Sequence, residues 1–379
     1  MNDSRRFIWC ILLKISVEDI NRKISISHLV QNADKTLINQ VNCDVDRCDL
    51  QSDIDKSNLK RLLISVFSYR RENYSYIQGI HEIGKVFLTL FREYKRSNLA
   101  KIKKKMSKLI VFSERFEAVI LFKLLIKKFN SEKGRADICF KAFDRFLMLY
   151  STPYIYKSDS LAQINLEYIL SNISQDLLYL LNKRSSNLYN FFIKLKAKAD
   201  KESSVCMFIL PWIITCFSHN ISIKQKKLIY YIFDHIISSH PLYIIFLIVE
   251  IIIQSETKLF FYLEQNFGSD VSLNFEENEI YPIVHFFFQN LDISNLKWKV
   301  IVSSSHKYLS GTRLSILNSY FLWEAGKRSK HDLIIGKTFF SKINEKLLMY
   351  LIFIALISSL LFSIYIGEFN FLKIGKKNY

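Results

Sequence analysis

The chain of 379 residues carries 53 lysines and arginines against 35 aspartates and glutamates, a formal net charge of +18. Half of its residues are hydrophobic and 15% are aromatic, which excludes a disordered chain. Only 9 glycines and 4 prolines disfavour a fold built on tight hairpins. The positive charge predicts anionic surroundings, whether nucleic acid, an acidic partner or a membrane face.

We expect no targeting signal in the N-terminal segment. MNDSRRFIWCILLKI has too short an apolar core for a signal peptide and no cleavage site, so we expect the bulk of the chain to face the cytosol. Six cysteines are spread along the sequence without a CxxC and without metal-ligand spacing to histidine. They predict reduced, buried thiols and no metal site.

The middle of the chain reads as a series of helices. Residues 57–73 carry leucines, a valine and a phenylalanine at helical spacing, and Ser57 stands where an N-cap is expected. The apolar segments 225–238 and 242–253 are separated at Pro241. No two-residue alternation or hairpin dipeptide supports strands, so the predicted fold class is all-α.

The C-terminal region predicts a membrane anchor. Residues 347–366 run for 20 positions without a charge, and such a helix is about 30 Å long, the thickness of a bilayer core. A buried core helix is the alternative, although such helices usually keep a polar stripe. We therefore expect a helical extension and linker at 301–346, a single transmembrane helix at 347–366 and a short lumenal tail at 367–379. The segment 242–253 is too short to span.

The sequence lacks the motifs of the common hydrolases and nucleotide-binding folds. Gly336-Lys337-Thr338 resembles the end of a phosphate-binding loop, but His331 stands where its first glycine is required. Asp234 and His235 lie within an apolar helical segment, and we interpret them as structural.

Two short segments could carry chemistry together. Asp44 and Arg47 are three residues apart, which places both side chains on one face of a helix. About thirty residues later come Tyr76, Gln78 and Gly79, where the glycine implies a positive φ or a close approach by another group. A guanidinium supplied from outside stabilises the charge of a transferring phosphoryl group, and an amide can orient the attacking water. Taken separately, a surface arginine and a Gln-Gly turn are ordinary features.

Taken together, these segments resemble a known family, the TBC-domain Rab GTPase-activating proteins. The resemblance runs from about residue 5 to 300 and rests on several blocks in the family's order: RRFIWCILL (5–13), VNCDVDR (41–47), YIQG (76–79), PWIITCFSH (211–219) and IFDHIISSHPLYIIF (232–246). It implies a TBC-type helical domain of two packed lobes at 1–300, with a Rab-family small GTPase as the partner. It also implies that Arg47 is an arginine finger and Gln78 a glutamine finger, supported by Asp44, Tyr76, Gly79 and His81. GTP and Mg²⁺ would belong to the partner, so the chain needs no cofactor of its own.

One branch of this family carries a C-terminal membrane anchor, and QGIHEI and DHIISSHPL resemble it. Membership of that branch implies a Rab of the early secretory pathway. It also implies a tail-anchored protein in the endoplasmic reticulum or early Golgi membrane, with its catalytic domain in the cytosol. Glu82 stands where that branch has an aspartate.

Two other classes of function remain open. The first is a catalytically inactive TBC-like membrane scaffold that binds a small GTPase, although such a scaffold has no reason to keep both fingers. The second is a tethered basic protein that binds nucleic acid or anionic lipid through its charge. The basic residues are dispersed and no aromatic-basic platform accompanies them, so we expect no nucleic-acid partner.

Overall fold

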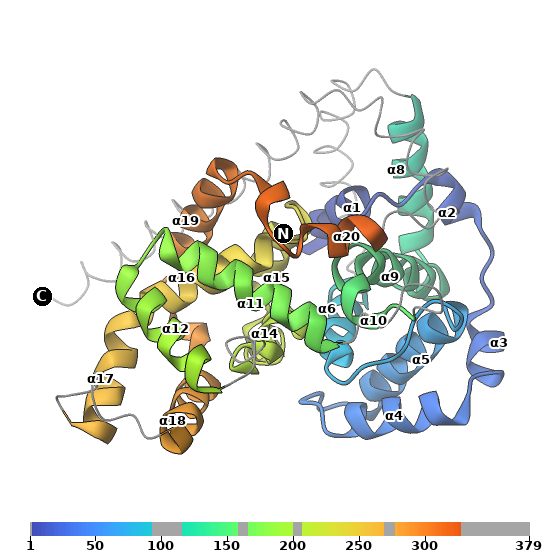
Figure 1. Ribbon diagram of the computed structural model, residues 1–379. Coiled ribbons are helices and arrows are strands. Elements are labelled where there is room, and N and C mark those ends of the chain that lie inside the picture. The colour runs from blue at the N-terminus through green and yellow to red at the C-terminus, as the bar shows by residue number, and fades with distance from the viewer. Residues whose placement is uncertain (1, 93–115, 158–165, 200–206, 269–276, 327–379) are drawn as a thin grey trace, which may run out of the picture.

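The computed structural model describes residues 2–92, 116–157, 166–199, 207–268 and 277–326, and these segments are mostly helical (Figure 1). They contain no named strand, and a single isolated antiparallel bridge joins Tyr74 to Tyr156. The predicted all-α fold class is therefore confirmed for this part of the chain.

None of the helices in these segments is long and apolar enough to cross a membrane. The span expected at 347–366, the tail at 367–379 and the part of the linker after residue 326 lie outside the described residues, so the anchor stays a prediction.

The helices form two groups that stand side by side in Figure 1. The first group contains α1 (Asn2–Leu12), α2 (Val17–Asn21), α3 (Ile26–Gln31), α4 (Lys35–Asp46), α5 (Asp53–Tyr69), α6 (Ile80–Arg92), α8 (Phe116–Phe129), α9 (Glu132–Phe146), the π-helical turn η2 (Leu147–Ser151) and α10 (Thr152–Ile155). Within it, α6 packs against α9 and against α5, and α4 packs against α5. The C-terminal end of α4 is thereby brought to the start of α6.

The second group begins at residue 166. It contains α11 (Leu166–Asn182), α12 (Ser186–Ala199), α14 (Leu210–Thr215), η3 (Ile223–Gln225), α15 (Lys226–Ile237), α16 (Tyr243–Gln254), α17 (Glu256–Phe267), α18 (Glu277–Asn290), η4 (Ile293–Asn295), α19 (Trp298–Gly311) and η5 (Leu314–Ile316). The last helix, α20 (Tyr320–Gly326), returns to the first group and packs on α10 and η2 (Figure 1). The apolar segment expected to be too short to span is α16, buried along its length and packed between α11 and α19. The domain boundary expected at residue 300 falls inside α19, and where the domain ends remains a prediction.

Helix α5 corrects one expectation. It begins at Asp53, with Ser52 at the N-cap, so Ser57 lies inside the helix. Asp53 and Asp55 occupy its first turn, where carboxylates favour the positive end of the helix dipole. The N-cap residue is five positions earlier than expected, and its side chain makes no capping hydrogen bond.

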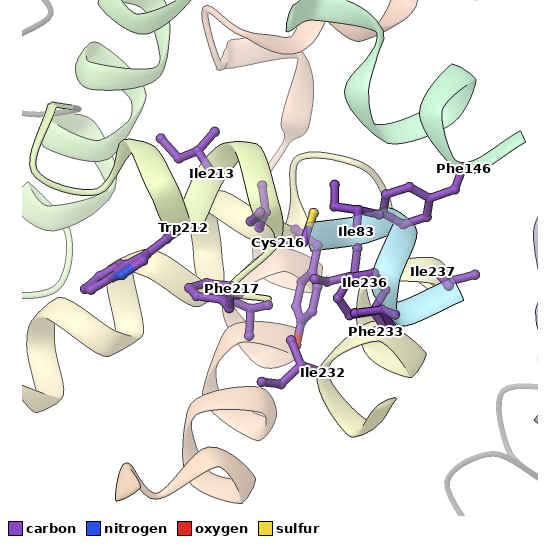
Figure 2. Close-up of a cluster of buried hydrophobic side chains, with 14 of the residues drawn as sticks. Ile83, Phe146, Trp212, Ile213, Cys216, Phe217, Ile232, Phe233, Ile236 and Ile237 are labelled. Atoms are coloured by element: carbon purple, nitrogen blue, oxygen red, sulfur yellow. The ribbon is translucent and has the colours of Figure 1, made fainter. Parts of the chain in front are cut away.

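The two groups are joined by an aromatic core around α15. The ring of Phe233 stacks on Trp9 of α1 and on Phe146 at the end of α9, with ring centroids 5.8 and 5.7 Å apart. Figure 2 shows Ile83 and Phe146 from the first group beside Cys216 and the isoleucines of α15 from the second. Since all these side chains are buried, the two halves share one core.

The N-terminal motif is anchored in that core. Trp9 is fully buried and its indole Nε1 donates to Asp234 Oδ1 at 2.7 Å, while the Arg5 guanidinium donates to both oxygens of the same carboxylate. The Arg6 Nε donates to the backbone oxygen of Leu90 at 2.6 Å. The structural interpretation of Asp234 therefore holds. Among the described cysteines all are unpaired, but Cys43 is exposed, which corrects the expectation that every thiol is buried.

Candidate functional site

The arginine of the first segment lies at the end of α4. Arg47 is the C-cap residue, and its side chain is 68% exposed while that of Asp44 is only 7% exposed. The guanidinium Nη2 donates to Asp44 Oδ1 at 3.0 Å, and Nε donates to the carbonyl oxygen of Cys43 at 3.0 Å. A cation is also favourable at a helix C-terminus. The Arg47 side chain is thus held by two hydrogen bonds, and the rest of its guanidinium is accessible to a partner.

Tyr76 joins this arginine to the second segment. Its hydroxyl donates to Asp44 Oδ2 at 2.8 Å, and its ring meets Phe67 edge to face at 5.2 Å between centroids. Burial, together with the adjacent Asp44 carboxylate, raises the pKa of Tyr76 well above its usual range, so the hydroxyl stays protonated and donates. One oxygen of Asp44 therefore binds Arg47 of the first segment, and the other binds Tyr76 of the second.

Gly79 has both features that the sequence analysis considered for it, a positive φ and a close approach by another group. Its φ is +100°, a conformation that side-chain-bearing residues rarely adopt, and a Cβ placed on it would lie 3.2 Å from Thr215 Cγ2 and 3.4 Å from Ile214 Cγ2. The turn at Gln78 and Gly79 thus packs closely on α14 and leads directly into α6. Gln78 itself is exposed, two residues beyond the Tyr76 ring.

Behind these residues lies a buried polar cluster on α6. The His81 ring stands between two carboxylates, with Nδ1 3.4 Å from Asp44 Oδ2 and Nε2 3.3 Å from Glu82 Oε1. Lys85 Nζ lies 2.5 Å from Glu82 Oε2 and 2.5 Å from Asp49 Oδ1.

Two groups in this cluster have displaced pKa values. Burial would raise the pKa of Glu82, but contacts with His219, His81 and Lys85 outweigh it and hold the pKa well below its usual range. Burial would lower the pKa of Lys85, yet the charges of Glu82 and Asp49 raise it. Both groups therefore stay charged although they are buried.

His219 reaches the same cluster from the other half of the domain. It follows α14, and its Nδ1 lies 3.7 Å from Glu82 Oε1. This contact raises the pKa of His219 above its ordinary value, against the effect of partial burial.

Four residues that the sequence analysis named as site residues meet in the structure, and three further residues of the site were not predicted. Arg47, Tyr76 and His81 each contact the Asp44 carboxylate, and Gln78 and Gly79 are their neighbours in the chain. Asp49, Lys85 and His219 were not predicted. Lys85 could have been found from its spacing of three to Glu82 on a helix, whereas no local pattern connects His219 to residues so far away in the sequence.

The site is a surface, and its polar tips face outward. A cavity of about 300 Å³ lies beside the C-terminal end of α5, lined by Tyr69, Arg70, Lys141 and their neighbours, and none of its lining residues belongs to the segments around Arg47 and Gln78. Among the described residues, no three histidines, cysteines or carboxylates gather to hold a metal ion. The arrangement is typical of a protein that presents side chains to a macromolecular partner.

Comparisons with known proteins agree with this class. Residues 2–260 match the Rab-GTPase-TBC domain family, and the chain belongs to that family. It is 32% identical over 97 residues to the GTPase-activating protein gyp10 of Schizosaccharomyces pombe, a match that covers 26% of this chain and only 24% of that protein. It is also similar to the crystal structure of the Ypt/Rab-GAP domain of Gyp1p, with a TM-score of 0.52 and 15% identity over 82% of this chain and 89% of that one.

The helical TBC domain expected from the sequence is thereby confirmed, and such a domain implies a Rab GTPase as partner. These matches do not distinguish the branch with a membrane anchor, which remains a prediction.

Proposed function

We propose that this protein accelerates GTP hydrolysis by a Rab-family GTPase, with Arg47 and Gln78 entering the partner's nucleotide site. The observation that best supports the proposal is the bridge made by Asp44, which binds Arg47 through one oxygen and Tyr76 through the other. A single buried carboxylate thus ties the two segments that would supply the fingers.

Arg47 would neutralise the charge that develops on the transferring phosphoryl group. A guanidinium has five N–H donors, and two of its nitrogens donate to Asp44 and Cys43. The donors that remain can meet phosphoryl oxygens. Because the side chain is already held, less conformational entropy is lost when the transition state forms.

Gln78 would orient the attacking water. Its amide offers both an acceptor and donors, so it can accept a proton of the water and donate to a phosphoryl oxygen. The positive φ of Gly79 directs the turn, and the rigid contact of Gly79 with α14 keeps the amide at the partner's surface.

The remaining parts of the proposal concern partners and location. GTP and Mg²⁺ belong to the GTPase, and this chain supplies no cofactor. The segment 347–366 would anchor the protein in the endoplasmic reticulum or early Golgi membrane, next to a Rab of the early secretory pathway. The charge of +18 suits an acidic partner or lipid headgroups. Extraction of membranes with alkaline carbonate tests the anchor, since a spanning protein stays in the pellet and a peripheral one is released.

Single-turnover GTP hydrolysis across a panel of Rab proteins tests the activity, with the full chain as wild type, Arg47→Ala and Gln78→Ala. Removal of an arginine finger should cost about 10³ to 10⁵ of the acceleration, and Gln78→Ala should also abolish strong stimulation. Arg313→Ala and Gln31→Ala, both at exposed positions away from the site, serve as matched controls and should leave the rate unchanged.

Three outcomes would count against the proposal. A loss below about tenfold for Arg47→Ala would remove it as the finger, given the usual size of that effect. Binding of a Rab without stimulation by the wild type would favour the inactive scaffold. Stimulation of no Rab would reject the activity.

A further inference from the structure

The polar cluster on α6 extends beyond the residues that would touch the partner. Three carboxylates, Asp44, Asp49 and Glu82, face two permanent cations, Arg47 and Lys85. Among the described residues, His81 Nδ1 and Glu82 Oε2 have no partner at hydrogen-bonding angles, so their close contacts are electrostatic. The charges in this cluster are therefore interdependent.

Glu82 is at the centre of the cluster. Its side chain is 8% exposed and contacts His81 on one side and Lys85 on the other. A buried carboxylate is costly unless it is paired, and the loss of one member of such a set leaves the others uncompensated. The two nitrogens of His81 point to opposite carboxylates, so the charge of Glu82 influences how the ring faces Asp44.

The same carboxylate connects the two halves of the domain. His219 lies next to Glu82 Oε1 from the segment after α14, and the Ser222 hydroxyl donates to Asp49 Oδ2 at 3.3 Å from the same segment. The second half of the domain thus reaches the base of the finger site through polar contacts as well as through the packing of α14 on Gly79.

We propose that Glu82 is a positioning residue for the arginine finger. Its carboxylate holds the His81 ring against Asp44, and Asp44 in turn fixes the guanidinium of Arg47. The contacts with Lys85 and His219 keep Glu82 in place. The expected effect on the rate of GTP hydrolysis rests on the proposed function, whereas the expected restraint of the Arg47 side chain does not.

The kinetic test compares Glu82→Gln, which keeps the shape and removes the charge, with Glu264→Gln, an exposed glutamate on the distant α17. Because Glu82 is coupled to Arg47 through His81 and Asp44, Glu82→Gln should lower kcat of the stimulated reaction by about 3- to 30-fold. KM should stay unchanged. Glu264→Gln should match the wild type. In the Arg47→Ala background, Glu82→Gln should leave the affinity for the GTP-bound Rab unaltered, because a residue that acts through Arg47 has nothing left to position.

A second readout needs no GTPase. The Nη2–H of Arg47, which donates to Asp44, should exchange with solvent at least about tenfold faster in Glu82→Gln when observed by ¹⁵N NMR of the full chain, since each 1.4 kcal/mol of lost restraint is a factor of ten. If Glu82→Gln does not fold, His219→Gln replaces it, as that ring is exposed and can be exchanged without opening the core.

These measurements separate the two hypotheses. An unchanged kcat, an unchanged exchange rate of the Arg47 Nη2–H, or a fall in affinity in the Arg47→Ala background would each overturn the positioning role. If the wild type stimulates no Rab, the proposed function fails, and the exchange rate alone decides whether Glu82 positions Arg47.

Discussion

The substitution Gly79→Ala tests how tightly the glutamine turn is held. Its φ of +100° lies outside the region open to alanine, and such backbone strain costs about 1–3 kcal/mol. The new methyl group would also lie 3.2 Å from Thr215 Cγ2. Thr215 cannot easily rotate away, because its hydroxyl donates to the Pro211 oxygen at 2.6 Å and accepts from the His219 N–H at 3.3 Å. Overpacking of this kind costs about 1–3 kcal/mol more.

We therefore expect Gly79→Ala to lower the free energy of unfolding by roughly 2–6 kcal/mol, measured by urea titration of the full chain. Thr215→Ser keeps the hydroxyl and removes Cγ2, so the double variant should recover only the steric part. Gly311→Ala is the control, since no atom lies within 4 Å of its Cβ position and its φ is not in the left-handed region. A free energy of unfolding for Gly79→Ala within about 0.5 kcal/mol of the wild type would refute the reasoning.

Two further predictions concern the charges of the site. Asp44→Asn should reduce kcat of the stimulated reaction by about tenfold to a hundredfold, since a hydrogen bond to a charged group contributes roughly 1.5–3 kcal/mol; an unchanged kcat would mean that Arg47 needs no anchor. The second prediction concerns pH. Contact with Glu82 raises the pKa of His219, so its stabilisation is fully present below the unfolded value of about 6.5 and is lost as pH rises through the folded value. The difference in Tm between wild type and His219→Gln should therefore shrink from about pH 6 to about pH 8.5, and a constant difference would contradict it.

The local geometry of the site could be predicted from the sequence. The spacing of Asp44 and Arg47 placed them on one helical face, and they form an ion pair at 3.0 Å. The scarcity of glycine made Gly79 conspicuous, and it has the expected positive φ. Both predictions rest on interactions between residues close in the chain, where the backbone sets the distances.

Contacts between distant segments could not be predicted. Glu82 was noticed only as a departure from a family pattern, and its neighbour His219 comes from the segment after α14, on the other side of the shared core. The start of α5 was misplaced for a different reason, because a serine such as Ser57 suits an N-cap by residue type, yet the helix begins five residues earlier, after Ser52.

Apart from His219, the polar groups of the site come from residues 44 to 85. Within this stretch, Asp44 binds Arg47 through one oxygen and Tyr76 through the other. Helices α5 and α6 of this stretch pack on α3 and α9, whereas the second half of the domain reaches its polar groups chiefly through the imidazole of His219 and the Ser222 hydroxyl and packs on Gly79 through methyl groups of α14. Residues of the second half that make none of these contacts can therefore change in sequence without altering the geometry of Arg47 and Gln78. In evolutionary terms, we expect the geometry of Arg47 and Gln78 to be independent of the choice of GTPase, so that partner preference can diverge while these two side chains keep their positions.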